Sequence, residues 1–100
     1  MGNEKDGPKP PAEKHEFTAK CKPGPVYVYR SFLASPNGLI WRSAIRKVKS
    51  VMSDNGQWVG YPEIWDLVID VEGGSPQVIS NFSESEVKRL ETFLKGWLVR

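Results

Sequence analysis

An alternation of apolar and polar residues predicts a strand with one buried face over residues 64–71. Residues 72–76 contain two glycines and a proline, so residues 77–82 are predicted to return as the hairpin partner of that strand. The alternation places on one face of the first strand Trp65, Leu67, Ile69 and Val71. In the returning strand it places on one side Val78, Ser80 and Phe82.

The end of the chain has helical spacing. Ser83 is a good helix N-cap, and Glu86, three residues later, is placed to complete a capping box. Apolar residues then recur every three or four positions, which predicts an amphipathic helix over residues 83–98. Its apolar stripe consists of Val87, Leu90, Phe93, Leu94 and Trp97. This stripe is expected to pack against a sheet.

The middle of the chain predicts further strands. Residues 26–33 are rich in β-branched and aromatic side chains and precede a cluster of turn formers at 35–38, which indicates a strand and a tight turn. Residues 39–52 are ambiguous, because their apolar positions have helical spacing while turn-forming sequences flank them. A helix and two short strands with a corner near residues 43–45 both fit. Another short strand is predicted at 57–61.

The first quarter of the chain has the composition of a disordered segment. Residues 1–25 hold five of the eight prolines, five lysines, four acidic residues and a single aromatic residue. We therefore predict a disordered tail over residues 1–22 and one small domain over residues 23–100, as a chain of 100 residues allows. His15 and Cys21 fall in this tail, without packed neighbours to tune their reactivity, so neither is predicted to be catalytic.

The order of the later elements resembles a known superfold. Residues 40–48, 65–69, 73–74 and 83–98 read as a short strand turning a corner into a second strand, a hydrophobic strand, a glycine hairpin and a capped final helix. This pattern resembles the C-terminal half of small bacterial pleckstrin-homology-like domains. The resemblance implies an α+β fold in which a mainly antiparallel sheet, a partial barrel or sandwich, is packed by one C-terminal helix. It also favours two strands over residues 39–52.

Charge is distributed unevenly along the chain. Residues 26–52 contain five basic residues and no acidic one, whereas residues 53–100 contain eight acidic and four basic residues. Basic side chains beside aromatic rings can hold an anionic partner by charge-assisted hydrogen bonds. The candidate anionic contact therefore consists of Arg30, Arg42, Arg46, Lys47 and Lys49. A solvated face that pairs with the acidic residues of the later half explains the same pattern.

The aromatic residues divide into two groups. Trp65 and Trp97 fall on predicted buried faces and are expected in the core. A domain this small buries surface inefficiently, so several aromatic residues outside its core indicate a contact patch. The candidate aromatic contact surface consists of Tyr27, Tyr29, Trp41, Trp58 and Tyr61.

Residues with the spacing of a catalytic or metal site are not found in the sequence. Asp66 and Asp70 share a strand face, but four residues of strand separate them by about 13 Å, beyond the reach of a paired acid and base. One histidine and one cysteine cannot form a Cys/His zinc cage. We predict no catalytic residues, no metal and no cofactor, and therefore a protein that is not an enzyme.

The sequence as a whole predicts a small non-catalytic binding module that contacts an anionic partner through a basic face. The partner is expected to be another protein or a second copy of the chain. A nucleic-acid-binding protein is one alternative, and a small enzyme or ligand carrier with a tryptophan-lined pocket is another. No apolar run is long enough for a signal peptide or a membrane span, so a cytoplasmic location is expected.

Overall fold

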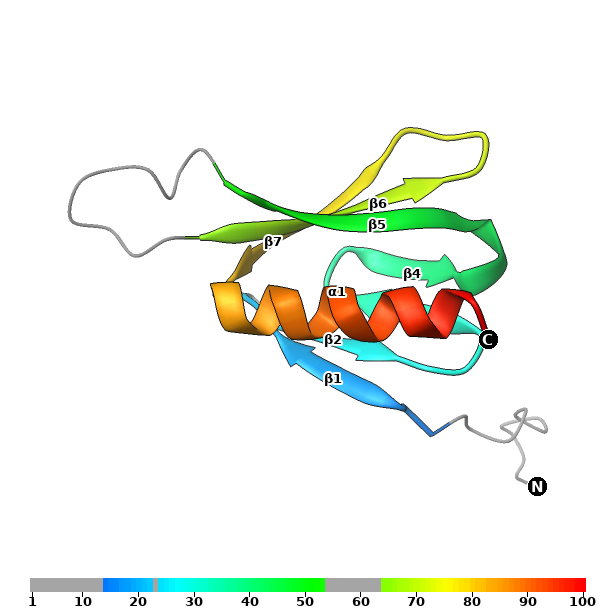
Figure 1. Ribbon diagram of the computed structural model, residues 1–100, viewed down its shortest axis with the longest axis horizontal. Coiled ribbons are helices and arrows are strands. Elements are labelled where there is room, and N and C mark those ends of the chain that lie inside the picture. Colours follow the sequence, from blue (N-terminus) through cyan, green and yellow to red (C-terminus); the bar gives the residue numbers. More distant parts are fainter. Residues whose placement is uncertain (1–13, 23, 54–63) are drawn as a thin grey trace, which may run out of the picture.

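The computed structural model describes residues 14–22, 24–53 and 64–100, which form two antiparallel sheets and one helix (Figure 1). The first sheet contains, in spatial order, β1 (Phe17–Lys20), β2 (Pro25–Val28), β3 (Phe32–Ser35) and β4 (Gly38–Trp41). The second contains β5 (Ile45–Met52), β6 (Trp65–Val71) and β7 (Gln77–Phe82). The 3₁₀ turn η1 (Arg42–Ala44) joins the sheets, and α1 (Glu84–Leu98) follows β7. The predicted α+β class is confirmed, with an open sandwich and not a closed barrel.

The predicted strand over residues 26–33 is two strands. The chain bends after β2, where the Tyr29 N–H donates to the Phe32 carbonyl at 2.8 Å, and then returns as β3. The sequence around this bend contains no glycine or proline, and its residues have neutral or high strand propensity, so no local signal indicated a turn. The following turn is confirmed, since Ser35 pairs with Gly38 and the φ of Gly38 is +134°, a value that favours glycine.

The predicted boundary of the domain at residue 22 is too late. Strand β1 lies before it, paired with β2, and Ala19 is fully buried. The ring of Phe17 stacks on that of Phe93 in α1, with centroids 4.6 Å apart. These long-range contacts order a segment whose composition alone indicates disorder. Residues 1–13 lie outside the described residues.

Residues 39–52 form two strands with a corner, as the resemblance implied. Strand β4 ends at η1, and β5 then pairs with β6 so that Val48 lies opposite Ile69. A register shift between Ile45 and Lys47 bends the start of β5. Seven strands lie within the described residues, and the pleckstrin-homology-like relationship remains a prediction. The strand predicted at 57–61 lies outside the described residues.

The hairpin of β6 and β7 is confirmed, with one correction. Leu67 and Ile69 are buried as the alternation predicted. In β7, however, Phe82 does not share a side with Val78, because a bulge at Asn81, with φ +73°, reverses the alternation. Phe82 therefore joins Ile79 in the core while Val78 remains exposed.

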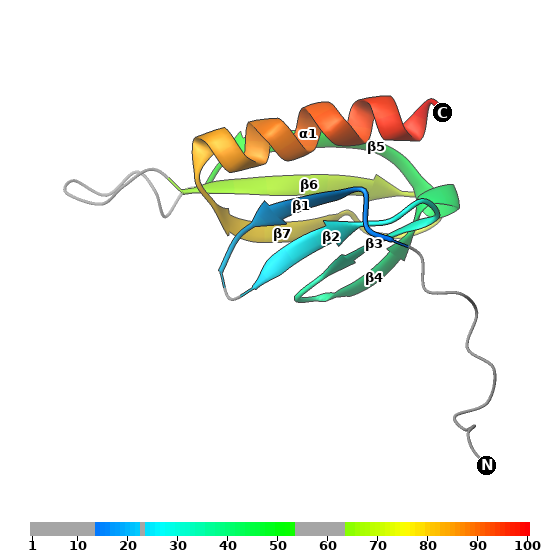
Figure 2. The same ribbon diagram turned by 90° about the horizontal axis from the view of Figure 1, so that it is seen from below.

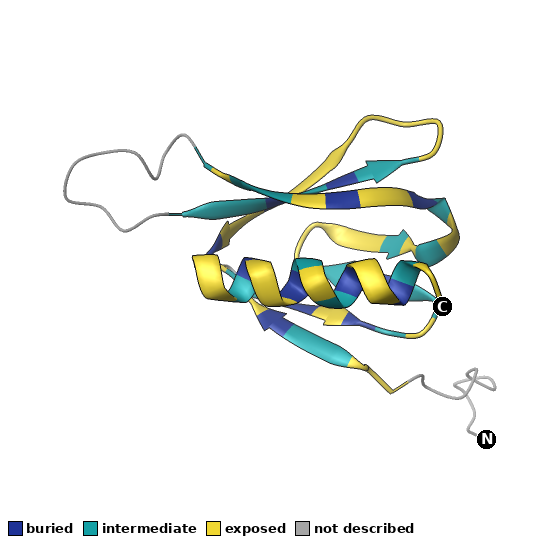
Figure 3. Cartoon of the chain, in the orientation of Figure 1, coloured by how far each residue is buried: buried dark blue, intermediate teal, exposed yellow. Residues whose placement is uncertain are grey.

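Helix α1 closes one side of the sandwich. The Ser83 hydroxyl oxygen accepts the Glu86 N–H at 3.3 Å, which confirms the predicted N-cap. The Glu86 carboxylate instead accepts the backbone N–H of Lys20 at 2.9 Å and so links the helix to β1. Figure 2 shows α1 at one side of the sandwich and β4 at the opposite side. Figure 3 shows buried residues alternating with exposed ones along the helix and strands. Within the predicted stripe, Phe93 is half-buried and the buried residues are Val87, Leu90, Leu94 and Trp97.

Candidate binding surface

Aromatic side chains cover the solvent side of the first sheet. The register places Tyr27 beside Ala34, Ala34 beside Leu39, and Phe32 beside Trp41. Their neighbours along the strands, such as Leu33, point into the core. Tyr29 follows β2 on the same side, and the ring of His15 lies near both tyrosines. We call this surface the aromatic face, and it consists of His15, Tyr27, Tyr29, Phe32, Leu39 and Trp41.

The rings of the aromatic face touch one another and remain open to solvent. Tyr29 stacks on Phe32 with centroids 4.5 Å apart, and Phe32 meets Trp41 edge-on at 5.7 Å. Trp41 is 57% exposed, Leu39 49% and Tyr27 37%. The solvent side of an antiparallel sheet is normally polar, so a continuous apolar face of this kind indicates a contact surface.

The structure brings together three of the five predicted aromatic contact residues, Tyr27, Tyr29 and Trp41. Trp58 and Tyr61 lie outside the described residues. Sequence reasoning missed Phe32, Leu39 and His15, because their neighbours depend on the β2–β3 bend and on β1. The one local signal is the spacing of Leu39 and Trp41, which is that of one strand face once residues 38–41 are taken as a strand.

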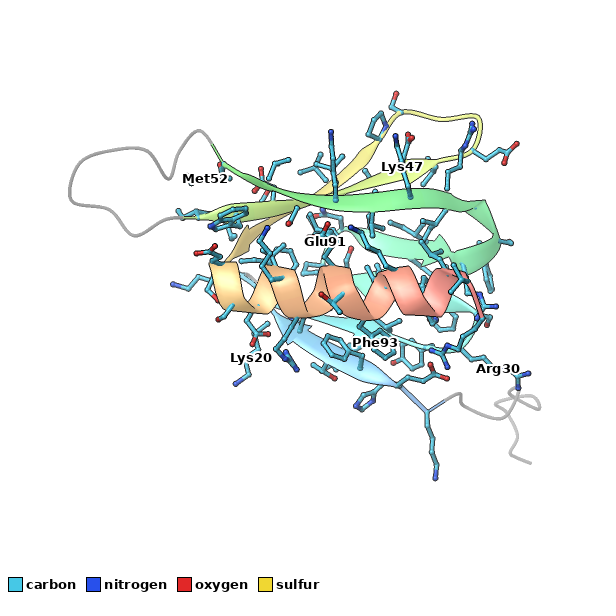
Figure 4. The ribbon with its side chains drawn as sticks, viewed as in Figure 1. Lys20, Arg30, Lys47, Met52, Glu91 and Phe93 are labelled. Atoms are coloured by element: carbon cyan, nitrogen blue, oxygen red, sulfur yellow. The ribbon has the colours of Figure 1, made fainter. Side chains whose placement is uncertain are left out.

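The five predicted basic residues do not form one positive surface. Arg30 and Arg42 lie at one end of the aromatic face, beside Trp41. Lys47 and Lys49 lie instead on the outer face of the second sheet, where Lys47 is opposite Asp70. Figure 4 shows Arg30 and Lys47 on opposite sides of the molecule. Arg46 is exposed at the register shift of β5.

Arg42 links three parts of the fold. One of its guanidinium nitrogens donates to the Arg30 carbonyl at 3.2 Å and another to the Arg100 carbonyl at 2.9 Å. The guanidinium also lies 5.7 Å from the centre of the Trp97 ring. Arg42 therefore ties η1 to the β2–β3 bend and to the end of the helix. Around it lies a surface depression of about 760 Å³, which is lined by Arg30, Ser31, Trp41, Arg42, Ser43, Ile45 and Leu98.

Trp97 supports the aromatic face from inside. It is 1% exposed, as predicted for a core residue, and its indole N–H donates to the Tyr29 carbonyl at 2.7 Å. Because the Tyr29 ring stacks on Phe32, this hydrogen bond fixes the backbone from which the face is built. The helix thus positions a surface on the far side of the sheet.

Cys21 and His15 are not in a tail, contrary to the sequence prediction. The Cys21 thiol is half-buried and donates to the Gly24 carbonyl at 3.0 Å. Burial raises the pKa of this thiol. The thiol is therefore protonated near neutral pH, which is unfavourable for a nucleophile. The His15 ring lies 5.4 Å from that of Tyr27.

Two glutamates of α1 tie the helix to the sheets. The hydrogen bond from the Lys20 N–H, aided by Arg89, holds the pKa of Glu86 below its ordinary value. Partial burial raises the pKa of Glu91, but hydrogen bonds from Ser50, at 2.6 Å, and from Lys95 more than offset this effect and lower it overall. Both carboxylates are therefore charged and structural at neutral pH.

A cleft of about 280 Å³ separates the two sheets on the side away from the helix. The Asn37 side-chain amide crosses it at one end and donates to the Val78 carbonyl at 3.0 Å. It is lined by Ser35, Asn37, Gly38, Leu39, Ile40, Trp41, Ala44, Val71, Glu72, Gln77 and Ile79. Its volume lies just below the roughly 300 to 1,000 Å³ typical of small-molecule sites.

Among the described residues, no group of three or more His, Cys, Asp and Glu side chains is placed to hold a metal ion. Within the same ranges, α1 is too short and too polar to cross a bilayer, and it is the sole α-helix there. Comparisons of the chain with protein families, curated proteins and solved structures found no match.

Proposed function

We propose that the protein is a non-catalytic interaction module that binds another protein through the aromatic face. The observation that carries this proposal is the exposure of Tyr27, Leu39 and Trp41 on a sheet surface where strand alternation normally places polar residues. Tyr and Trp are enriched at protein interfaces, because they bury a large area at little entropic cost. The half-buried rings of Tyr29 and Phe32 give this surface a rigid floor.

The depression beside Trp41 suggests the chemistry of the partner. Arg30 and Arg42 line it together with the hydroxyl-bearing residues Ser31 and Ser43. A carboxylate can accept hydrogen bonds from such groups while an apolar side chain next to it covers Trp41. We therefore expect a partner segment in which acidic residues stand beside apolar ones.

A protein partner is favoured over a nucleic acid by the placement of the basic residues. A nucleic-acid surface commonly has a continuous basic stripe that follows the phosphates. Here Lys47 and Lys49 lie on the other sheet, so the basic residues beside the aromatic face are confined to the depression at one end of it. Single-stranded nucleic acid is the second candidate partner of the aromatic face, because the exposed rings of Tyr27 and Trp41 are suited to stacking on bases.

The proposal is tested by selecting ligands for the full chain from a random peptide library and measuring their affinity by fluorescence polarisation. We expect selected peptides to combine acidic with aromatic or aliphatic residues. Tyr27→Ser is expected to weaken their binding at least about tenfold, as loss of an interface aromatic residue typically does. Val78→Ser is the matched control, since Val78 is similarly exposed, at 44%, on the outer face of the other sheet.

Peptides that bind Tyr27→Ser as tightly as the unaltered chain would refute the proposal. A second arm uses a labelled single-stranded oligonucleotide of mixed sequence. Binding that falls steeply with added salt and is lost in Tyr27→Ser, without selection of any peptide, would establish the nucleic-acid alternative instead. Saturable binding of a small apolar dye in the cleft between the sheets, abolished by filling that cleft with Ala44→Phe, would favour the ligand carrier.

A further inference from the structure

The two sheets of an open sandwich have four edge strands, and three of them carry a protective feature. Strand β1 is covered by α1, through the hydrogen bond from its Lys20 N–H to Glu86. Strand β5 packs against the same helix through Ser50 and Glu91 and carries exposed lysines. Strand β7 has a bulge at Asn81 and is capped at Val78 by the Asn37 amide. Helices, charges and bulges are the usual means of preventing edge-to-edge pairing.

Strand β4 lacks every one of these features within the described part of the chain. Its sequence, Gly38–Trp41, contains no charge and no proline, and it lies at the margin of the sheet opposite the helix (Figure 2). Two of its side chains, Leu39 and Trp41, are about half exposed. An apolar edge strand without such protection is a template for the addition of another strand.

The backbone groups of β4 that point outward can be identified. The Arg42 N–H donates to the Ser31 carbonyl at 2.8 Å, so Arg42 faces β3, and alternate residues before it, Ile40 and Gly38, do the same. The N–H and carbonyl of Leu39 and the N–H of Trp41 therefore point away from β3, toward the open edge, while the Trp41 carbonyl begins the first turn of η1. Their side chains both lie on the aromatic face.

We propose that a second copy of this chain pairs with β4 in antiparallel fashion, with a two-fold axis at Ile40. In this register Leu39 lies opposite Trp41 of the partner subunit, and the reverse pair is generated by symmetry. Each pair matches the outward N–H and carbonyl of Leu39 with the carbonyl and N–H of Trp41 in the partner subunit. The Trp41 carbonyl, which also belongs to the first turn of η1, accepts this bond through its second lone pair. Arg42 lies opposite Gly38 of the partner subunit, so no like charges meet.

The self-complementarity of this edge selects a second copy as the occupant. The symmetric pairing also stacks the exposed Leu39 side chain against the exposed Trp41 ring of the partner subunit, which buries apolar area that one copy leaves in water. It would join two four-stranded sheets into one and make the two aromatic faces continuous. Because β4 has four residues, the interface is small, and we expect weak association that depends on concentration. This inference uses the edge of the sheet and does not depend on the proposed function.

The first test is sedimentation velocity of the full chain from about 10 μM to about 1 mM, the range in which a small interface associates. A reversible monomer–dimer equilibrium is expected. Trp41→Pro removes one outward N–H from each edge at a residue whose φ of −69° suits proline, so the fold is retained. It is expected to weaken association at least about tenfold more than Trp41→Ala, which removes the ring but keeps the N–H.

The second test examines the register. Across the two-fold axis the two Ile40 residues form a non-hydrogen-bonded pair with Cα atoms about 4.5 Å apart, a distance that a disulfide spans. Ile40→Cys, in a Cys21→Ser background, is expected to form a disulfide-linked dimer on mild oxidation, whereas Leu39→Cys, which faces Trp41 of the partner subunit, is not. The proposal is overturned if the chain stays monomeric throughout the concentration range, or if Trp41→Pro and Trp41→Ala associate equally. It is also overturned if Leu39→Cys forms the cross-link in place of Ile40→Cys.

Discussion

The indole of Trp97 provides a quantitative test of how the helix supports the aromatic face. Trp97 is 1% exposed, and its N–H donates to the Tyr29 carbonyl at 2.7 Å. Trp97→Phe removes this donor and leaves the carbonyl without its partner, at a cost of about 1 to 3 kcal/mol. The smaller ring also buries about two fewer carbon atoms, which costs about 1.6 kcal/mol at the usual 0.8 kcal/mol for each buried CH₂ group. Together these costs are about 3 to 5 kcal/mol, a large part of the stability of a small domain.

Urea unfolding followed by far-ultraviolet circular dichroism measures this loss without relying on tryptophan fluorescence. The matched control is Leu94→Val, a fully buried position on the same helix that loses one carbon atom and no hydrogen bond, with an expected cost of about 1 kcal/mol. An unchanged m-value is expected for both variants, because the surface exposed on unfolding is nearly the same. If Trp97→Phe costs no more than Leu94→Val, the hydrogen bond to Tyr29 does not anchor the sheet.

Two further predictions concern single interactions. Glu91 has a lowered pKa in the folded chain, so its contribution to stability is present above its unfolded pKa and is lost as pH falls through the folded value. Ser50→Ala should therefore destabilise the chain by about 1.5 kcal/mol at pH 7. This difference in unfolding free energy should shrink as the pH falls to and below the ordinary pKa of glutamate. Parallel urea titrations in which the difference does not vary with pH would contradict the prediction. Gly38 and Gly96 both have open space where a Cβ would lie, but only Gly38 has a positive φ. Gly38→Ala should accordingly lower the free energy of unfolding by about 1 to 3 kcal/mol, while Gly96→Ala should raise it by about 0.5 kcal/mol. Thermal unfolding measures both changes, and equal effects would show that backbone conformation does not cause the difference.

The elements that the sequence predicted well are those with strong local signals. The alternation of residues 64–71 and the N-cap at Ser83 depend on neighbours along the chain, and the structure confirms both. The periodicity of residues 39–52 did not distinguish a helix from two strands with a corner, because the spacing of Ile45 and Val48 fits both. Pairing with β6, a long-range interaction, decides in favour of strands.

The errors have a common physical origin in tertiary contacts. Strand β1 was missed because its order comes from Phe93 and β2, which no local composition reveals. The bend at Tyr29 carries no glycine or proline, and the bulge at Asn81 reverses the side of Phe82 without a recognisable signal.

The candidate site was predictable in part for the same reason. The sequence indicated that aromatic residues form a contact surface, and Tyr27, Tyr29 and Trp41 do lie together. Closeness in sequence did not bring Arg42 and Lys47 to one surface, because the corner at η1 sends the chain into the other sheet between them. Which charges share a face is decided by topology, and a run of basic residues that crosses a corner is divided by it.

The most direct test of the account is to map the binding surface on the isotopically labelled chain by nuclear magnetic resonance, while a library-selected peptide is added. We expect the amide shifts to concentrate on β2, β3 and β4, around Tyr27, Phe32 and Trp41, with the outer face of the second sheet unaffected. Shifts concentrated instead around Lys47, Lys49 and Val78 would contradict the assignment of the aromatic face as the contact surface.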